Sequence, residues 1–152
     1  MQGRELLDRL RRAGVRCPVY LYATDDYWCL PADARPALVV VNTDLRQRRG
    51  EHYVSFYVHA DGRSVTYFDS LGFEPYQCLR RFWRRHNFRL VRYNSRLLQN
   101  PLSDTCGYYQ IAFAALMDIG VGFRVFLNTL SDNPVRNDKV ILKFVNYLET
   151  RQ

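Results

Sequence analysis

Apolar and polar residues recur along the chain with two different periods, one typical of helices and the other of strands. Apolar residues follow helical spacing, with polar residues opposite them, in three segments: 5–13, 75–86 and 137–150. The segment 106–118 is nearly all apolar, which predicts a buried helix that ends near Gly120. Runs that are apolar or rich in Val, Tyr and Phe predict strands at 37–41, 52–59, 64–68 and 88–93, while the aromatic segment 19–28 is predicted to be irregular. Strands early and buried helices late predict an α+β fold.

The dipeptide Asp61-Gly62 separates two of these strands and is a strong signal for a two-residue hairpin turn. A turn at these residues places Val54 opposite Asp69 in the hairpin. His52 lies two residues before Val54 and points to the same face, so His52 and Asp69 become diagonal neighbours whose side chains can meet. A carboxylate in that position orients an imidazole ring and favours its charged form. The alternative interpretation is a structural His–Asp pair at the rim of the sheet.

Cys106 opens the buried helix in the run Ser103-Asp104-Thr105-Cys106-Gly107, where any of the three residues before the Cys can cap the helix. A thiol at a helix N-terminus has a lowered pKa because it faces the positive end of the helix dipole. Gly107 leaves the backbone open beside the sulfur, where a substrate carbonyl has to approach. A Cys, a His and an Asp in separate segments form the arrangement of a thiol hydrolase. The alternative is a core Cys that begins a core helix.

A candidate oxyanion donor precedes the Cys. Gln99 lies seven residues before Cys106. Its side-chain amide can donate a hydrogen bond to a developing oxyanion, together with the backbone N–H of Cys106. A Gln in a polar loop is common, so this assignment depends on Cys106 being a nucleophile.

Length and composition restrict the classes of function. The chain has 152 residues, the size of one domain, and 47% of them are hydrophobic and 24% charged, which argues against overall disorder. No apolar run approaches the roughly 18 residues of a membrane-spanning helix, and the first residues lack a secretory pattern, so a soluble intracellular protein without membrane contact is expected. The four cysteines lack zinc-finger spacing, so reduced thiols, no disulfide framework and no metal site are predicted.

The charge of the chain suggests a partner. Lys and Arg number 22 against 15 Asp and Glu, a formal net charge of +7, which favours a polyanionic partner. Arginines in one loop and one helix are candidates for sequence-independent binding to the phosphate backbone of DNA: Arg46, Arg48, Arg49, Arg80, Arg81, Arg84 and Arg85. The alternative is a solvated basic surface that aids solubility.

Four residues occur in the chain order that resembles the adenovirus protease (adenain) and its relatives, the SUMO and ubiquitin-like-protein proteases: His52, Asp69, Gln99 and Cys106. The motif YFDSLG at 67–72 looks like the acidic motif of the SUMO proteases. The segment QNPLSDTCG at 99–107 is more similar to adenain, in which the Gln also lies seven residues before the Cys and is followed by x-Pro. Residues 41–43 and 50–53 also resemble adenain's approach to its catalytic His.

The resemblance implies a role for each of the four residues in acyl transfer. Cys106 is the nucleophile, and His52 is the general base and then the general acid. Asp69 orients His52, at a position where adenain commonly has Glu and the SUMO proteases have Asp. Gln99 and the backbone N–H of Cys106 form the oxyanion hole.

The resemblance covers nearly the whole chain and implies one cysteine protease domain over residues 1–152. Its fold is a mixed β-sheet packed against helices, with Cys106 at the N-terminus of a buried central helix and with Tyr53 and Gly107 beside the substrate channel. The expected activity is that of a viral endopeptidase that cleaves capsid or core precursor proteins at Gly-containing sites, in the virion and the host nucleus. Two alternatives stay open: a SUMO or ubiquitin-like-protein isopeptidase, and a non-enzymatic Arg-rich module that binds nucleic acid.

The implied chemistry requires no cofactor. Adenain is activated by a peptide from a capsid precursor, which forms a disulfide with a Cys upstream of the oxyanion Gln. Here residues 86–98 contain no Cys, and Cys78 lies nearer the acidic motif, which argues against a covalently attached peptide. A viral peptide bound without a covalent link and DNA remain open as activators.

Overall fold

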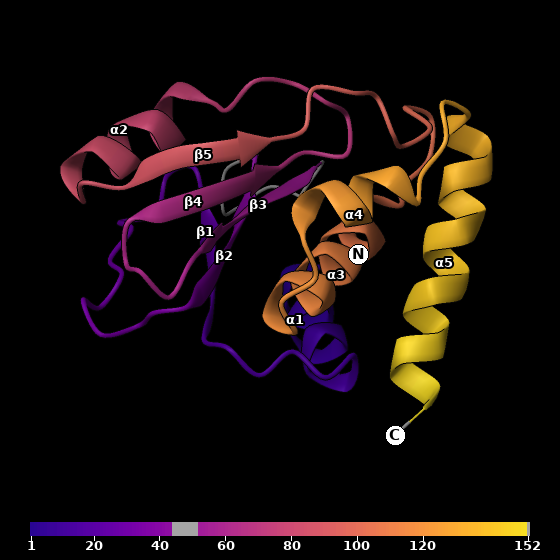
Figure 1. Cartoon of the computed structure of the whole chain (residues 1–152), viewed down its shortest axis with the longest axis horizontal. Coiled ribbons are helices and arrows are strands. Elements are labelled where there is room, and N and C mark those ends of the chain that lie inside the picture. Colours follow the sequence, from indigo (N-terminus) through magenta and orange to yellow (C-terminus); the bar gives the residue numbers. More distant parts are fainter. Residues whose placement is uncertain (44–51, 152) are drawn as a thin grey trace.

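The computed structural model describes residues 1–43 and 52–151. Within these residues five strands form one mixed sheet in the order β1-β2-β3-β4-β5 (Figure 1). The strands are β1 (Val19–Ala23), β2 (Ala37–Asn42), β3 (Tyr53–Val58), β4 (Ser64–Phe68) and β5 (Arg89–Tyr93). The outer pairs β1–β2 and β4–β5 are parallel, and the inner pairs β2–β3 and β3–β4 are antiparallel. The predicted mixed α+β architecture is therefore confirmed.

Helices cover both faces of this sheet (Figure 1). The helices of the described residues are α1 (Gly3–Arg12), α2 (Gln77–Arg85), α3 (Cys106–Asp118), α4 (Phe123–Asn128) and α5 (Pro134–Thr150). Helix α3 contacts β3 as well as α1, α4 and α5, which makes it the central helix on its face. Helix α2 packs on the other face through Leu79, Phe82 and Trp83. None of these helices combines the length and the apolar character that a membrane span requires.

The central strands supply side chains to two hydrophobic clusters, because successive residues of a strand point to opposite faces of a sheet. Leu38 and Val40 of β2 belong to the cluster around α3, whereas Val39 and Val41 belong to the cluster beneath α2. A strand that is buried on both faces is apolar at every position, which explains the continuous apolar run at 37–41.

The hairpin has the predicted register. Phe56 pairs with Tyr67, and the residues on either side follow in step. Gly62 has a φ of +73°, the left-handed conformation that a tight hairpin turn requires. The Asp61 carboxylate accepts hydrogen bonds from the backbone N–H groups of Arg63 and Ser64. The predicted helix at 106–118 is present with the same bounds. The register therefore brings the start of β3 and the end of β4 together at the same end of the sheet.

Two elements differ from the sequence predictions. Residues 19–23 form strand β1, so the prediction of an irregular segment there is wrong. The sequence of β1 does not alternate between apolar and polar residues, so it lacks the usual signal of a strand. The strand is held by pairing with β2, which involves every residue of β1. The short helix α4 has no counterpart among the predicted elements. Its Phe123 and Phe126 rings pack against Phe68 and Phe113, so tertiary contacts stabilise a helix too short to form alone.

Candidate active site

The two ends of the hairpin bring a His and an Asp together. His52 directly precedes β3 and Asp69 directly follows β4, and His52 Nε2 lies 2.6 Å from Asp69 Oδ1. The predicted contact is therefore present. Asp69 is fully buried, and its Oδ2 atom has no hydrogen-bond partner among the described residues. A buried carboxylate needs a compensating positive charge, which favours the protonated form of His52.

The backbone that follows Asp69 packs tightly against the segment before Gln99. The Asn94 side-chain amide donates hydrogen bonds of 2.9 Å to the carbonyl oxygens of both Asp69 and Arg96. Gly72 has a φ of +78°, and a Cβ atom at this position would lie 2.4 Å from the Arg96 carbonyl oxygen. A residue with a side chain cannot occupy position 72 without displacing that backbone. The site therefore depends on a close approach of two loops.

Helix α3 delivers Cys106 to the His–Asp pair as its first residue. The thiol forms a hydrogen bond with the His52 ring, and it also contacts the backbone of Tyr53 and Gly107. Because Asp69 occupies Nε2 of His52, Nδ1 is the ring nitrogen left for the sulfur. Gln110, one turn along α3, donates a 3.0 Å hydrogen bond to the Tyr53 carbonyl and so fixes the helix against the start of β3.

The charges of the two groups support each other. Burial by itself raises the pKa of the Cys106 thiol, but the hydrogen bonds from His52 and from backbone groups outweigh burial and lower it. Burial by itself lowers the pKa of His52, but the contacts with Asp69 and Cys106 raise it to about 9. A lowered thiol pKa beside a raised imidazole pKa favours a thiolate–imidazolium pair near neutral pH.

No side chain caps the N-terminus of α3. Thr105 occupies the N-cap position, but its hydroxyl pairs with that of Ser103 at 2.8 Å and accepts no helix N–H. One of the three predicted residues is therefore the N-cap, but its side chain makes no capping hydrogen bond. The backbone N–H of Cys106, the first residue of the helix, also donates to no acceptor within the described part of the chain. This N–H is available to a substrate oxygen, as an oxyanion hole requires.

Gln99 lies in the loop that leads to Cys106, with only 3% of its surface exposed. Its Oε1 atom lies 2.6 Å from the Ser70 hydroxyl, and its Nε2 atom donates to the Ser103 carbonyl at 3.1 Å. The side chain is thus engaged at both ends. One N–H of Nε2 has no partner among the residues the structure describes.

The residues predicted to border the substrate channel have different surroundings. The Tyr53 ring is 2% exposed and packs in the cluster around α3, and its hydroxyl donates to the Met1 carbonyl at 3.2 Å. Met1 also covers Gly107, because its Sδ atom lies 2.8 Å from the position of a Cβ at residue 107. The expectation that Gly107 leaves its backbone open is therefore wrong, because Met1 occupies the space over this glycine.

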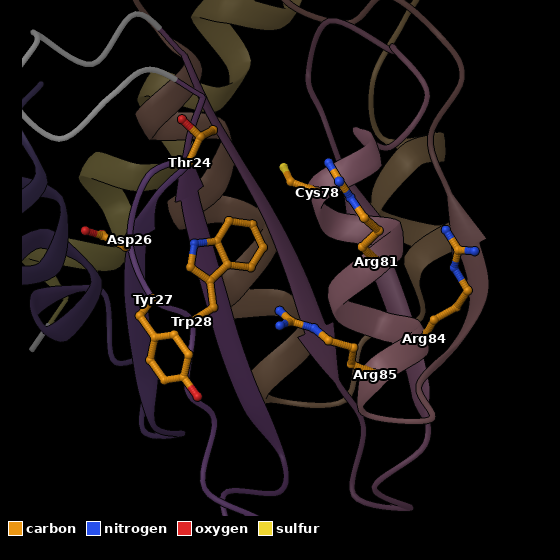
Figure 2. Close-up of a pocket in the computed structure, with 8 residues that line it drawn as sticks. All are labelled: Thr24, Asp26, Tyr27, Trp28, Cys78, Arg81, Arg84 and Arg85. Atoms are coloured by element: carbon orange, nitrogen blue, oxygen red, sulfur yellow. The ribbon is translucent and has the colours of Figure 1, made fainter.

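The candidate nucleic-acid-binding arginines of α2 lie on the face of the sheet opposite α3. Arg81, Arg84 and Arg85 of α2 line a cavity of about 650 Å³, opposite the segment that holds Tyr27 and Trp28 (Figure 2). Within the described residues, none of these three arginines forms an ion pair. Arg80 differs, because it is half-buried and donates to the Pro75 carbonyl at 3.3 Å. The loop arginines Arg46, Arg48 and Arg49 lie outside the described residues.

Comparison with known proteins identifies the fold. No protein-family model and no curated protein sequence matches the chain. Two crystal structures of the ASFV pS273R protease are similar to it, one with 23% identity and a TM-score of 0.56, the other with 18% and 0.52. Each covers 76% of this chain but only 44% and 42% of the ASFV protein, so the chain spans less than half of that protease. The SUMO protease Ulp1 aligns at 15% identity over 75% of this chain and 52% of its own, with a TM-score of 0.43. The chain has the fold of the ASFV protease.

Ser70 and Asn94, which the structure places at the site, have no role that the sequence patterns predict. Ser70 stands next to Asp69 in the YFDSLG motif, and that position is the only signal it carries. Asn94 follows β5 in a polar segment without a motif. Both are buried, at 0% and 2% exposure. Their importance follows from contacts between loops that are distant in the sequence.

Proposed function

We propose that this protein is a cysteine endopeptidase that cleaves peptide bonds through Cys106, His52 and Asp69. The observation that carries the proposal is the His52 ring, held between the Asp69 carboxylate at 2.6 Å and the Cys106 thiol. This arrangement supplies a thiolate as nucleophile and an imidazolium as proton donor. The similarity in fold to a viral protease supports an enzyme over a purely nucleic-acid-binding module.

The reaction follows from the positions of these groups. The Cys106 thiolate attacks the carbonyl carbon of the scissile peptide, and the carbonyl oxygen becomes an oxyanion. The Cys106 N–H and an N–H of Gln99 stabilise that charge. The C–N bond then breaks, the His52 imidazolium transfers its proton to the leaving amine, and a thioester forms. Neutral His52 next takes a proton from water, which hydrolyses the thioester and restores the ion pair.

The substrates we propose are viral capsid or core precursor proteins, cleaved at Gly-containing sites in the virion or the host nucleus. The support is the resemblance of residues 99–107 to adenain, in the spacing from Gln99 to Cys106 and in the x-Pro that follows the Gln. The second candidate is a SUMO or ubiquitin-like-protein isopeptidase, and the YFDSLG motif with Asp at position 69 favours it. The two candidates differ in whether a folded modifier is required.

Three substrates tested in parallel distinguish these functions. They are extended peptides with Gly at the scissile bond, SUMO and ubiquitin C-terminal probes, and recombinant capsid precursors. We expect wild-type protein to cleave the peptides and the precursors, and Cys106→Ser to cleave none. Matched peptides with bulky residues beside the scissile bond should react more slowly. Reaction with the SUMO or ubiquitin probes alone would favour the isopeptidase, and no cleavage of any substrate would contradict the enzymatic proposal.

We also propose DNA as a partner and, together with a non-covalently bound viral peptide, as an activator. The arginines around the α2 cavity, which form no ion pair within the described residues, support binding to phosphates (Figure 2). Affinity for labelled duplex DNA should fall linearly with salt on a log–log plot, and Arg81→Glu with Arg85→Glu should reduce the slope by about 0.9 for each phosphate that the variant no longer neutralises. The control variant carries Arg136→Glu and Lys139→Glu on α5, which change the net charge equally. Binding without salt dependence, or equal slopes in both variants, would contradict this site.

A further inference from the structure

The residue after Asp69 holds the candidate oxyanion donor in place. Ser70 is fully buried between the end of β4 and the loop that contains Gln99. Its backbone carbonyl accepts hydrogen bonds from the N–H groups of Leu98 at 2.9 Å and Gln99 at 3.0 Å. Its hydroxyl lies 2.6 Å from Gln99 Oε1. Three hydrogen bonds from one residue therefore join the loop of Gln99 to the segment that carries Asp69.

The contacts of Gln99 determine which way its carboxamide faces. The carbonyl of Ser103 can only accept a hydrogen bond, so the atom 3.1 Å from it must be the nitrogen Nε2. The oxygen Oε1 then faces Ser70, whose hydroxyl must donate to it. A carboxamide rotated by half a turn would set its oxygen against the Ser103 carbonyl oxygen. The Ser70 hydroxyl thus keeps the N–H groups of Gln99 on the side of the loop that leads to Cys106.

We propose that Ser70 is a positioning residue that directs the Gln99 amide toward the oxyanion formed at Cys106. This inference rests on the proposed peptidase function and deepens it. Without the Ser70 hydroxyl, Gln99 Oε1 is buried with no donor, and the carboxamide gains freedom to rotate away from the reacting oxygen. A donor that must reorient during the reaction stabilises the transition state less than one already in place. Among the described residues, the Ser70 side chain forms no hydrogen bond with His52 or Cys106.

A double-mutant cycle between Ser70→Ala and Gln99→Ala tests the proposal with a cleaved peptide substrate. Loss of an oxyanion donor costs about 10²-fold or more in kcat, so we expect about 10²-fold for Gln99→Ala and about tenfold for Ser70→Ala. KM should change little in either variant, because the interaction is made in the transition state. In the Gln99→Ala background, Ser70→Ala should have no further effect. A peptide aldehyde places an oxygen in the oxyanion hole. Its affinity should therefore fall more in Gln99→Ala than in Ser70→Ala.

The control is Ser55→Ala, which removes a buried Ser hydroxyl that donates to another carboxamide, that of Gln110. Whatever its effect on kcat, that effect should add to the effect of Gln99→Ala, because the Ser55 hydroxyl bonds to Gln110 and not to Gln99. The pH dependence of Cys106 alkylation should be unchanged in Ser70→Ala, which separates positioning of Gln99 from damage to the ion pair.

The outcomes separate this inference from the proposed function. Wild-type activity together with an unchanged kcat in Ser70→Ala would overturn the role of Ser70 and leave the peptidase intact. Additive effects of Ser70→Ala and Gln99→Ala would also overturn it, as would an altered alkylation profile. Absence of hydrolysis by the wild-type protein would overturn the peptidase proposal and the role of Ser70 with it. Circular dichroism would reveal a failure of Ser70→Ala to fold. In that case Ser70→Thr, which keeps the hydroxyl, provides the test: a kcat near that of the wild type would support the inference, and a reduced kcat would overturn it.

Discussion

Replacing Asp69 by Asn removes the buried negative charge beside His52 while keeping a side chain of similar shape. The His52 pKa of about 9 is the result of burial, which lowers it, and of the contacts with Asp69 and Cys106, which raise it. The difference from its ordinary value of 6.5 corresponds to about 3 kcal/mol in favour of the imidazolium. Because Cys106 supplies part of this effect, Asp69→Asn should lose between about tenfold and 10²-fold in kcat/KM near neutral pH.

The pH dependence gives the sign of the effect. In wild-type protein, the imidazolium is present below about pH 9 and is lost as the pH rises through that value. The thiolate is present above the lowered pKa of Cys106, so the ion pair occupies the interval between the two pKa values. In Asp69→Asn, burial lowers the His52 pKa without an opposing carboxylate, and the weaker imidazolium raises the Cys106 pKa. The pH range in which the thiolate–imidazolium pair exists should therefore become narrower at both its lower and its upper limit, or disappear.

The assay measures kcat/KM against pH together with the ultraviolet absorbance of the thiolate. The matched control is Asp118→Asn, which removes a carboxylate at the far end of α3 that accepts hydrogen bonds from the backbone of Arg16 and Cys17. Asp118→Asn should keep the wild-type profile. An upper limb that stays near pH 9 in Asp69→Asn would refute the argument that Asp69 sets the charge of His52. The loss should also be smaller than for Cys106→Ala, which removes the nucleophile.

Two further predictions concern reactivity and packing. Iodoacetamide should label Cys106 much faster than Cys17, because burial and, to a smaller extent, Asp118 raise the pKa of Cys17 to about 12. Equal labelling rates, measured by mass spectrometry, would contradict an activated Cys106. Gly72→Ala should destabilise the fold by roughly 3 kcal/mol or more, because it adds a clash with the Arg96 carbonyl to the cost of a left-handed φ. Gly62→Ala, with a similar φ but only ordinary contacts, should cost about 1 kcal/mol in thermal unfolding, and equal losses for both variants would exclude the clash.

Local patterns along the chain were sufficient to predict one part of the site. The turn at Asp61-Gly62 determines the hairpin register, and the two-residue period of strands then places His52 beside Asp69. The apolar run 106–118 likewise predicts the helix that begins at Cys106. These features depend on periodicity and turn chemistry. Both act over a few neighbouring residues, so they can be predicted from the sequence alone.

Other features depend on residues that meet only in the folded protein. Strand β1 is held by its pairing with β2, and α4 by aromatic rings from two other elements, so neither has a local signal. Met1 fills the space over Gly107, although more than a hundred residues separate them. The bond from Ser70 to Gln99 joins two loops in the same way. Periodicity specifies which residues share a face of one element, whereas packing between elements decides what lies against that face, and only the tertiary structure contains that information.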